Sequence, residues 1–105
     1  MLSPSQRIWG YETPDGAFAQ FCRVQCRQLL PRPKHLTSEE SACYTLTLAT
    51  AYRMMFGHAP HQLGPGQHVL VWGAAGGLGS FALQLARTVG AKPIPLSPAM
   101  KKPTT

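Results

Sequence analysis

The segment from Gln67 to Gly90 constrains the fold more than any other part of the chain. It opens with four consecutive apolar residues, Val69 to Trp72, which are typical of a strand buried on both faces. Four of the next seven residues are glycine. Apolar residues then recur at helical spacing from Phe81 to Val89, and Gly90 stands where a helix would end. The order of strand, glycine turn and helix predicts the opening unit of a dinucleotide-binding fold.

The glycine turn explains why this order suits a nucleotide. Glycine lets the backbone turn tightly and approach a pyrophosphate, whose charge is met by amides at the start of the next helix. A glycine motif placed between a strand and a helix is stronger evidence than the bare motif. The alternative is a tight turn that joins a strand to a helix and binds nothing.

The charge of the chain limits its partners. At 105 residues the sequence fits one small domain or a piece of a larger one. The net charge of +6 arises because ten Lys and Arg residues meet only four acids, all within the first forty residues. The basic residues form no run except Lys101-Lys102. This pattern argues against nucleic acid as a partner and suits small molecules that carry phosphate.

Three cysteines are present, with no CxxC pair and no histidine at metal-ligand spacing. We therefore expect no metal site and a reducing, cytoplasmic environment. Cys22 and Cys26 are expected to pack on one face of a strand. No stretch resembles a signal peptide or is long enough for a membrane span, so we expect a soluble chain without a membrane partner.

The first half of the chain predicts a strand, a linker and a helical stretch. Residues 17–30 read as extended, and prolines at 31 and 33 begin a linker. Thr37 and Glu40 form a capping box at the start of a helix that closes at Gly57. The threonine-rich centre, 44–50, weakens this stretch, and the sequence leaves open one helix or two with a kink near Tyr44.

The pattern changes after Gly90, where a second parallel strand is due. Pro93 and Pro95 stand at alternate positions and remove donors that an interior strand needs. We therefore predict that no regular strand forms here and that residues 93–105 are a divergent, disordered tail. A doubly wound sheet needs more strands than this sequence supplies, so we expect the chain to be truncated.

Three blocks of the sequence resemble crotonyl-CoA carboxylase/reductase, a branch of the medium-chain dehydrogenase/reductase superfamily. The blocks are QRIWGYETPDGAFAQF, LLPRPKHLTSEESACYTLTLATAYRMMFGHAPH and GQHVLVWGAAGGLGS. The glycine block alone indicates only the superfamily, whereas the WGYETPDG and CYTLTLATAYRM segments are more specific. The resemblance runs from Gln6 to about Ala91. It implies a partial α/β fold in which residues 1–35 end a GroES-like β domain and residues 36–92 begin a Rossmann NADPH-binding domain.

The resemblance also implies a reaction. The family enzyme reduces crotonyl-CoA with NADPH and joins carbon dioxide to the resulting enolate, which gives ethylmalonyl-CoA. Such chemistry requires that water be excluded and that carbon dioxide be held close to the reacting carbon. The implied class is an oxidoreductase with NADPH as cofactor, an enoyl-CoA and CO2 as partners, and a homo-oligomeric parent enzyme.

Site residues follow from the same resemblance. Those implied at the NADPH pyrophosphate are Ala74, Ala75, Gly76, Gly77, Leu78 and Gly79. Thr50 matches a segment that borders the nicotinamide, and the alternative is a helix threonine bonded back to a carbonyl. Glu12, preceded by Tyr11, matches a glutamate that helps to hold carbon dioxide, and the alternative is a solvated turn glutamate. The partner asparagine and histidine of that site are expected outside this sequence.

Three functions remain open at this point. The first is a fragment of an NADPH-dependent reductive carboxylase. The second is an enoyl or quinone reductase of the same superfamily without carboxylation, against which Glu12 and the WGYE block count. The third is a catalytically inert, truncated nucleotide-binding remnant. The missing strands and the acid-free second half favour the third for the isolated polypeptide, so we expect the 105-residue chain alone to be inactive.

Overall fold

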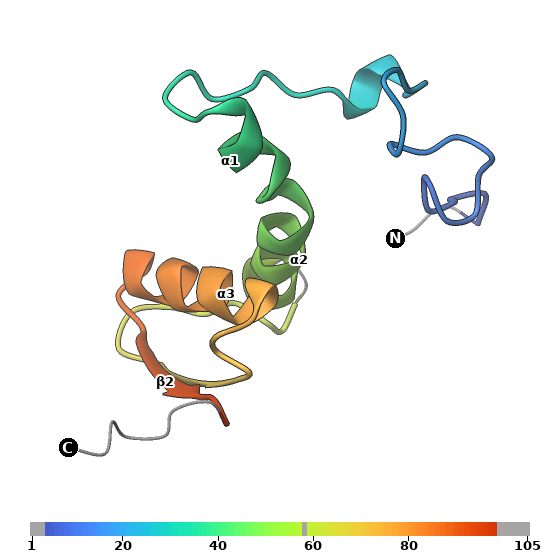
Figure 1. Ribbon diagram of the computed structural model, residues 1–105. Coiled ribbons are helices and arrows are strands. Elements are labelled where there is room, and N and C mark those ends of the chain that lie inside the picture. Colours follow the sequence, from blue (N-terminus) through green and yellow to red (C-terminus); the bar gives the residue numbers. More distant parts are fainter. Residues whose placement is uncertain (1–3, 58, 99–105) are drawn as a thin grey trace. The chain divides into compact units, whose positions relative to one another are not determined.

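The computed structural model describes residues 4–57 and 59–98. The chain divides after Pro33 into two compact units, which are described separately (Figure 1). The first unit holds one short 3-10 helix, η1 (Cys26–Gln28), among turns and bends. The second unit holds the remaining helices and both strands in the described part of the chain.

The prediction of a strand over residues 17–30 is wrong. This segment forms turns, bends and η1, and its backbone hydrogen bonds are local, such as Ala19 N–H to the carbonyl of Ala17. A strand needs a partner strand, and the described part of the first unit offers none. Phe18 and Phe21 are consequently 108% and 89% exposed. Cys22 and Cys26 are likewise exposed and free, and do not pack on a strand face as expected.

Two helices, not one, follow the linker. Thr37 accepts from the amide of Glu40 at 3.2 Å, and the Glu40 carboxylate accepts from the amide of Thr37 at 2.9 Å, which confirms the predicted capping box. Helix α1 (Ser38–Ala42) then ends at Cys43, and α2 (Thr45–Phe56) begins after it. The break falls at Cys43 and Tyr44, so the threonines of 44–50 lie within α2 and do not interrupt it. Helix α2 closes at Gly57 as predicted.

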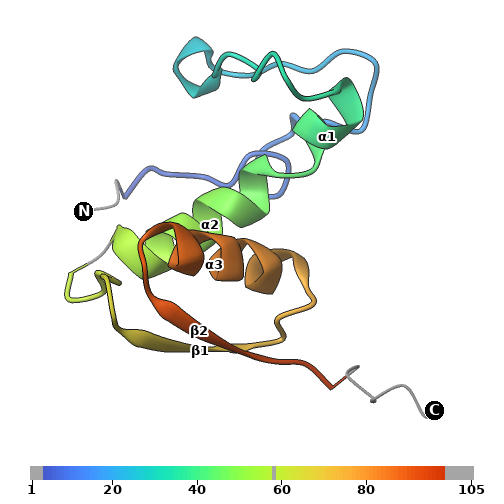
Figure 2. The same cartoon turned by 90° about the vertical axis from the view of Figure 1, so that its left-hand side faces the viewer.

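Residues 68–96 fold as a β-α-β unit. Strand β1 (His68–Trp72) leads through the glycine turn into α3 (Gly77–Thr88), which crosses back to β2 (Lys92–Leu96). The two strands are parallel, with His68 opposite Lys92 and Trp72 opposite Leu96. Figure 2 shows α2 and α3 together on one face of this sheet.

Helix α3 ends at the glycine that the sequence marked. Gly90 has φ +77°, a left-handed conformation that favours glycine. Its amide donates to the carbonyl of Arg87 at 3.1 Å, and the amide of Ala91 donates to that of Ala86 at 3.0 Å. These two bonds form a Schellman motif, which satisfies the last carbonyls of α3 and turns the chain directly into β2.

The structure corrects the prediction that no strand follows Gly90. The amide of Lys92 donates to the carbonyl of Gln67 at 2.7 Å, so it faces β1. Backbone groups of a strand alternate in direction, so every second residue after Lys92 also faces β1. Pro93 and Pro95 therefore have their nitrogens on the outer side of β2, where no ladder donor is lost. Part of the predicted tail, 99–105, lies outside the described residues.

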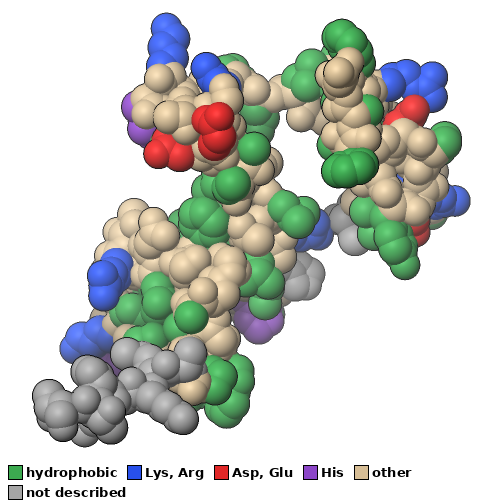
Figure 3. Space-filling model, in the orientation of Figure 1, with side chains coloured by type: hydrophobic (Ala, Val, Ile, Leu, Met, Phe, Trp, Pro, Cys, Tyr) green, Lys and Arg blue, Asp and Glu red, His purple; other side chains and the backbone are tan. Residues whose placement is uncertain are grey.

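The core of the second unit is thin. Its buried apolar residues within 34–57 and 59–98 are small, namely Ala51, Val71, Ala74, Ala86 and Ala91, and no large side chain in these two ranges is fully buried. On the sheet face away from the helices, Leu70, Trp72, Ile94 and Leu96 are 41–80% exposed. Figure 3 shows apolar side chains spread over the visible surface. No helix within residues 4–57 and 59–98 has the length and apolarity that a membrane span requires.

Candidate nucleotide-binding site

The glycine turn lies at the carboxyl end of β1 and leads into the first turn of α3. Gly73 has φ +71°, and its carbonyl accepts from the amide of Gly76 at 3.0 Å. The amide of Ala74 donates to the carbonyl of Leu96 at 3.0 Å. The turn is therefore attached to the end of β2 as well as to β1. In open α/β sheets this edge, outside the carboxyl ends of the strands, is where ligands bind.

Gly79 permits the close packing of the turn. A Cβ atom at this position would overlap the carbonyl oxygen of Gly73 and lie 2.7 Å from Cα of Ala74. Gly77 has a similar role toward α2, since its Cβ would lie 3.2 Å from Cγ2 of Thr47. Both positions are restricted by neighbours and not by their own backbone angles, because neither has a positive φ.

The start of α3 has the properties that a bound pyrophosphate needs. The N-cap, Gly76, has no side chain to accept from the first amides of the helix. The amides of Gly77, Leu78 and Gly79 are the first three of α3, which have no carbonyl partner within a helix. Ala75, Gly76, Gly77 and Leu78 are exposed, while Ala74 and Gly79 are buried beneath them. Partial positive charge at this end favours an anion, so the residues present fit the pyrophosphate of a dinucleotide.

Helix α2 contributes to the surroundings of the turn. Thr47 is the residue that contacts Gly77. Thr50, one turn further along α2, is exposed, and its hydroxyl donates to the carbonyl of Leu46 at 2.7 Å. This hydrogen bond within the helix is the predicted alternative to a contact with the nicotinamide. A hydroxyl that donates in this way still has lone pairs to accept from a ligand, so its role beside a nicotinamide stays a prediction.

Glu12 and Tyr11 belong to the first unit. The Glu12 carboxylate accepts from the amide of Ile8 at 2.6 Å, and the amide of Glu12 donates to the carbonyl of Ile8 at 2.8 Å. Glu12 therefore closes its own turn, which matches the alternative of a turn glutamate. Tyr11 is 83% exposed. The role of these two residues toward carbon dioxide stays a prediction.

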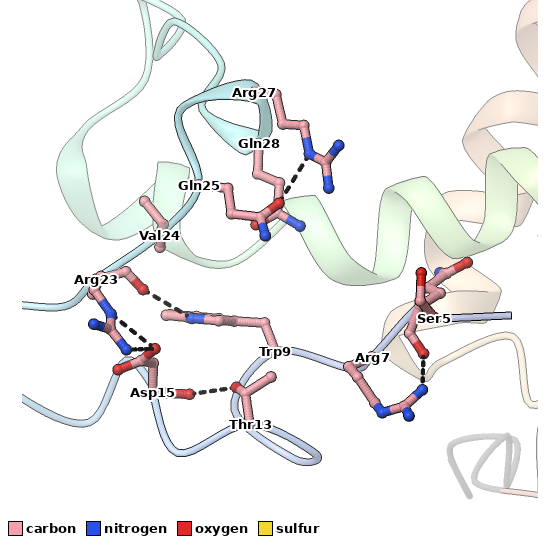
Figure 4. Close-up of a pocket in the computed structure, with 11 residues that line it drawn as sticks. Ser5, Arg7, Trp9, Thr13, Asp15, Arg23, Val24, Gln25, Arg27 and Gln28 are labelled. Carbon is pink, nitrogen blue, oxygen red and sulfur yellow. Dashed lines mark hydrogen bonds and ion pairs between the residues drawn. The ribbon is translucent and has the colours of Figure 1, made fainter. Parts of the chain in front are cut away.

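A hollow of about 800 Å³ lies beside this turn in the first unit. Figure 4 shows the Trp9 ring at its centre, with the indole N–H directed at the carbonyl of Arg23, a bond of 3.0 Å. Arg23 also pairs with Asp15 at 2.9 Å. Glu12 is not among the residues that line the hollow. The structure thus brings Trp9, Asp15 and Arg23 together and leaves Glu12 outside this cluster.

Two residues near the glycine turn were missed by the sequence argument. Leu96 was missed because its strand was rejected, although its carbonyl anchors Ala74. Thr47 was missed because the family resemblance assigned a cofactor contact only to Thr50, one turn further along the helix. The spacing of the two prolines held the signal for Leu96, since alternate prolines suit one edge of a strand. In the described part of the chain, no group of three His, Cys, Asp or Glu residues is placed to hold a metal ion.

Comparison with known proteins gives close relatives along most of the chain, although no family model matches. Crotonyl-CoA carboxylase/reductase of Cereibacter sphaeroides is 76% identical over 94 residues, which are 90% of this chain and 22% of that protein. The solved structure of the crotonyl-CoA carboxylase/reductase AntE in complex with NADP has a TM-score of 0.90 at 48% identity, over 93% of this chain and 24% of that one.

A third similar protein was solved with its substrate. The 2-octenoyl-CoA carboxylase reductase CinF, in complex with NADP and 2-octenoyl-CoA, has a TM-score of 0.83 at 46% identity. The match covers 90% of this chain and 21% of that one. The chain thus spans less than a quarter of the length of each of these three relatives.

The β-α-β unit, its glycine turn and these neighbours define the class. The chain is an α/β piece of the medium-chain dehydrogenase/reductase type, which confirms the predicted fold class. Within that class its sequence is similar to the crotonyl-CoA carboxylase/reductases, with 76% identity to one of them over 90% of its length.

Proposed function

We propose that this chain forms the pyrophosphate-binding part of an NADPH site in a reductive carboxylase that converts crotonyl-CoA and CO2 to ethylmalonyl-CoA. The observation that carries the proposal is the start of α3, where the amides of Gly77, Leu78 and Gly79 meet no capping side chain. The relatives solved with NADP support the choice of cofactor. We assign the pyrophosphate to residues Ala74, Ala75, Gly76, Gly77, Leu78 and Gly79.

Bound NADPH would supply a hydride to the unsaturated thioester, and the protein would supply position and electrostatics. The α3 amides hold the pyrophosphate, and the closely packed turn under Gly79 fixes their direction. We place Thr50 beside the nicotinamide and Glu12, with Tyr11, beside carbon dioxide. We further infer that residues 1–35 close a GroES-like substrate domain, that residues 36–92 open the Rossmann domain, and that the whole enzyme is a cytoplasmic homo-oligomer.

A chimaera tests this proposal. The 94 residues of this chain that align with the Cereibacter sphaeroides relative replace the matching segment of that enzyme. We expect crotonyl-CoA-dependent NADPH oxidation and incorporation of labelled carbon dioxide in the chimaera, and neither in the isolated 105-residue chain. Oxidation of NADPH with only a saturated acyl-CoA as product would favour the plain enoyl reductase. A folded chimaera that neither binds NADPH nor turns over would favour the inert remnant.

A further inference from the structure

Helix α2 packs against the first turn of α3 through residues with small side chains (Figure 2). Gly77, the first residue of α3, has no side chain to hold the two helices apart, and Thr47 of α2 is half-buried beside it. Ala51, one turn after Thr47 on the same side of α2, is 3% exposed. The separation of two packed helices depends on the side chains at their contact. At this end of α3, the contact is made by Thr47.

The contact between Thr47 and Gly77 leaves little free space. A Cβ atom at Gly77 would lie 3.2 Å from Cγ2 of Thr47, 3.8 Å from its Cβ and 4.0 Å from its hydroxyl oxygen. The first distance is shorter than an ordinary van der Waals contact between carbon atoms, whereas the other two are ordinary contacts. The methyl group of Thr47, and not its hydroxyl, therefore fills the space beside Gly77.

The two helices carry the two halves of the proposed NADPH site. The first amides of α3, among them that of Gly77, are assigned to the pyrophosphate. Thr50, three residues after Thr47 on α2, is assigned to the nicotinamide. A dinucleotide that reaches both must span the distance between α2 and α3, and a small displacement of one contact impairs the fit at the other. The separation of the helices is therefore part of the binding geometry.

We propose that Thr47 is a positioning residue for NADPH. Its methyl group packs beside Gly77 and holds α2 at the distance from α3 that the whole dinucleotide needs. Thr50 thereby stays in the correct place relative to the pyrophosphate amides. Thr47 acts through this contact and does not itself touch the cofactor. This role rests on the proposed NADPH site, so its test also shows whether that site exists.

Two ligands, measured on the chimaera, distinguish helix separation from general damage to the fold. NADPH reaches both helices, whereas phospho-ADP-ribose keeps the pyrophosphate and lacks the nicotinamide. Thr47→Ser removes the methyl group and keeps the hydroxyl. We expect it to weaken NADPH binding by about fivefold, the scale of one lost buried methyl group, and to leave the affinity for phospho-ADP-ribose unchanged. Isothermal titration calorimetry measures both dissociation constants.

Moving the methyl group across the contact should restore binding. Gly77→Ala alone places its methyl group against Cγ2 of Thr47 and should weaken NADPH binding by about threefold or more. Combined with Thr47→Ser, the same methyl group meets only atoms at 3.8 and 4.0 Å, so the NADPH affinity should return to within about twofold of the parent. Thr47→Val keeps a methyl group, loses the hydroxyl and should bind like the parent. Thr45→Ser, at an exposed position of α2, is the matched control.

The results separate this role from the proposed function. If the folded parent chimaera binds neither ligand, the NADPH site and the role of Thr47 are both wrong. If it binds both ligands, but Thr47→Ser weakens them equally or not at all, the site stands and the positioning role is overturned. A double variant that binds no better than Gly77→Ala would also overturn it, as would a loss confined to Thr47→Val, since the hydroxyl would then contact NADPH directly. If Thr47→Ser fails to fold, as circular dichroism would show, Gly77→Ala decides, because it too should weaken NADPH and spare phospho-ADP-ribose.

Discussion

Single residues decide the shape of the glycine turn, and Gly79 is the most restricted of them. Its missing Cβ makes room for the carbonyl of Gly73, which in turn accepts from Gly76. Gly76, the N-cap of α3, has no side chain, so it leaves the following amides of Gly77 and Leu78 uncapped and available to a ligand. Within this short motif, buried Gly79 thus permits close packing of the turn, whereas exposed Gly76 leaves the start of α3 uncapped.

Gly79→Ala should destabilise the second unit strongly. The added methyl group meets backbone atoms of Gly73 and Ala74, which have little room to move, so we expect a loss of about 3 kcal/mol or more in the free energy of unfolding. Gly64→Ala is the control, since its Cβ would meet only the Gln67 side chain, at 3.8 Å. Urea unfolding followed by circular dichroism measures both. Equal midpoints for the two variants would contradict the close packing described here.

Glu12→Gln tests the proposed role of that carboxylate within the chimaera. If the charge helps to hold carbon dioxide, its loss should lower the ratio of carboxylated to merely reduced product by about tenfold, comparable to losing one hydrogen bond to a charged group. Glu39→Gln, at the first turn of α1, should leave the ratio unchanged. A fall in total NADPH oxidation at constant ratio would instead indicate a structural role in the turn that Glu12 closes with Ile8.

At the scale of elements, the direction of each backbone group in β2 decides whether proline is tolerated. The backbone nitrogens of Pro93 and Pro95 face outward. The backbone groups of Lys92, and of every second residue after it, face β1. The amino-acid composition does not show whether these prolines face β1 or the outer side of the strand. The strand is possible because both occupy the same side and that side has no neighbour in the described sheet.

Ile94→Pro and Pro95→Ala should therefore differ sharply, although they are adjacent. Ile94→Pro removes an inward donor between β2 and β1, so we expect a cost of about 3 kcal/mol or more. Pro95→Ala adds an amide that faces outward, and we expect a change below about 1 kcal/mol. Chemical unfolding of both variants measures the difference. A gain in stability for Pro95→Ala, with little cost for Ile94→Pro, would instead show that residue 95 faces β1 and that the register is shifted by one residue.

At the scale of the whole molecule, many large apolar side chains are exposed because the buried core is small. Among the residues that the structure describes, four alanines and one valine form the buried core, while Phe18, Phe21, Leu30 and Trp72 are at least 80% exposed. A small domain already buries a lower fraction of its surface than a large one. All four acidic residues lie within the first forty residues, so α2, α3 and both strands carry no acidic side chain.

This surface predicts weak cooperativity for the isolated chain. We expect a broad thermal transition, a calorimetric enthalpy well below about 0.7 kcal/mol per residue, and binding of the dye ANS in buffer without denaturant. Differential scanning calorimetry and dye fluorescence measure these properties. A sharp two-state transition without dye binding would show that the exposed apolar groups are covered in solution.

Local signals in the sequence determined the glycine turn, the capping box of Thr37 and Glu40, the ends of α2 and α3 at Gly57 and Gly90, and the family resemblance. Each depends on residues close together in the chain, where spacing alone fixes which groups meet. The tertiary structure decided what depends on distant partners: that residues 17–30 form no strand, that β2 does form, and that Leu96 holds Ala74. A strand is stabilised by backbone hydrogen bonds to a neighbouring strand, and a short stretch of sequence does not show which segment that neighbour is.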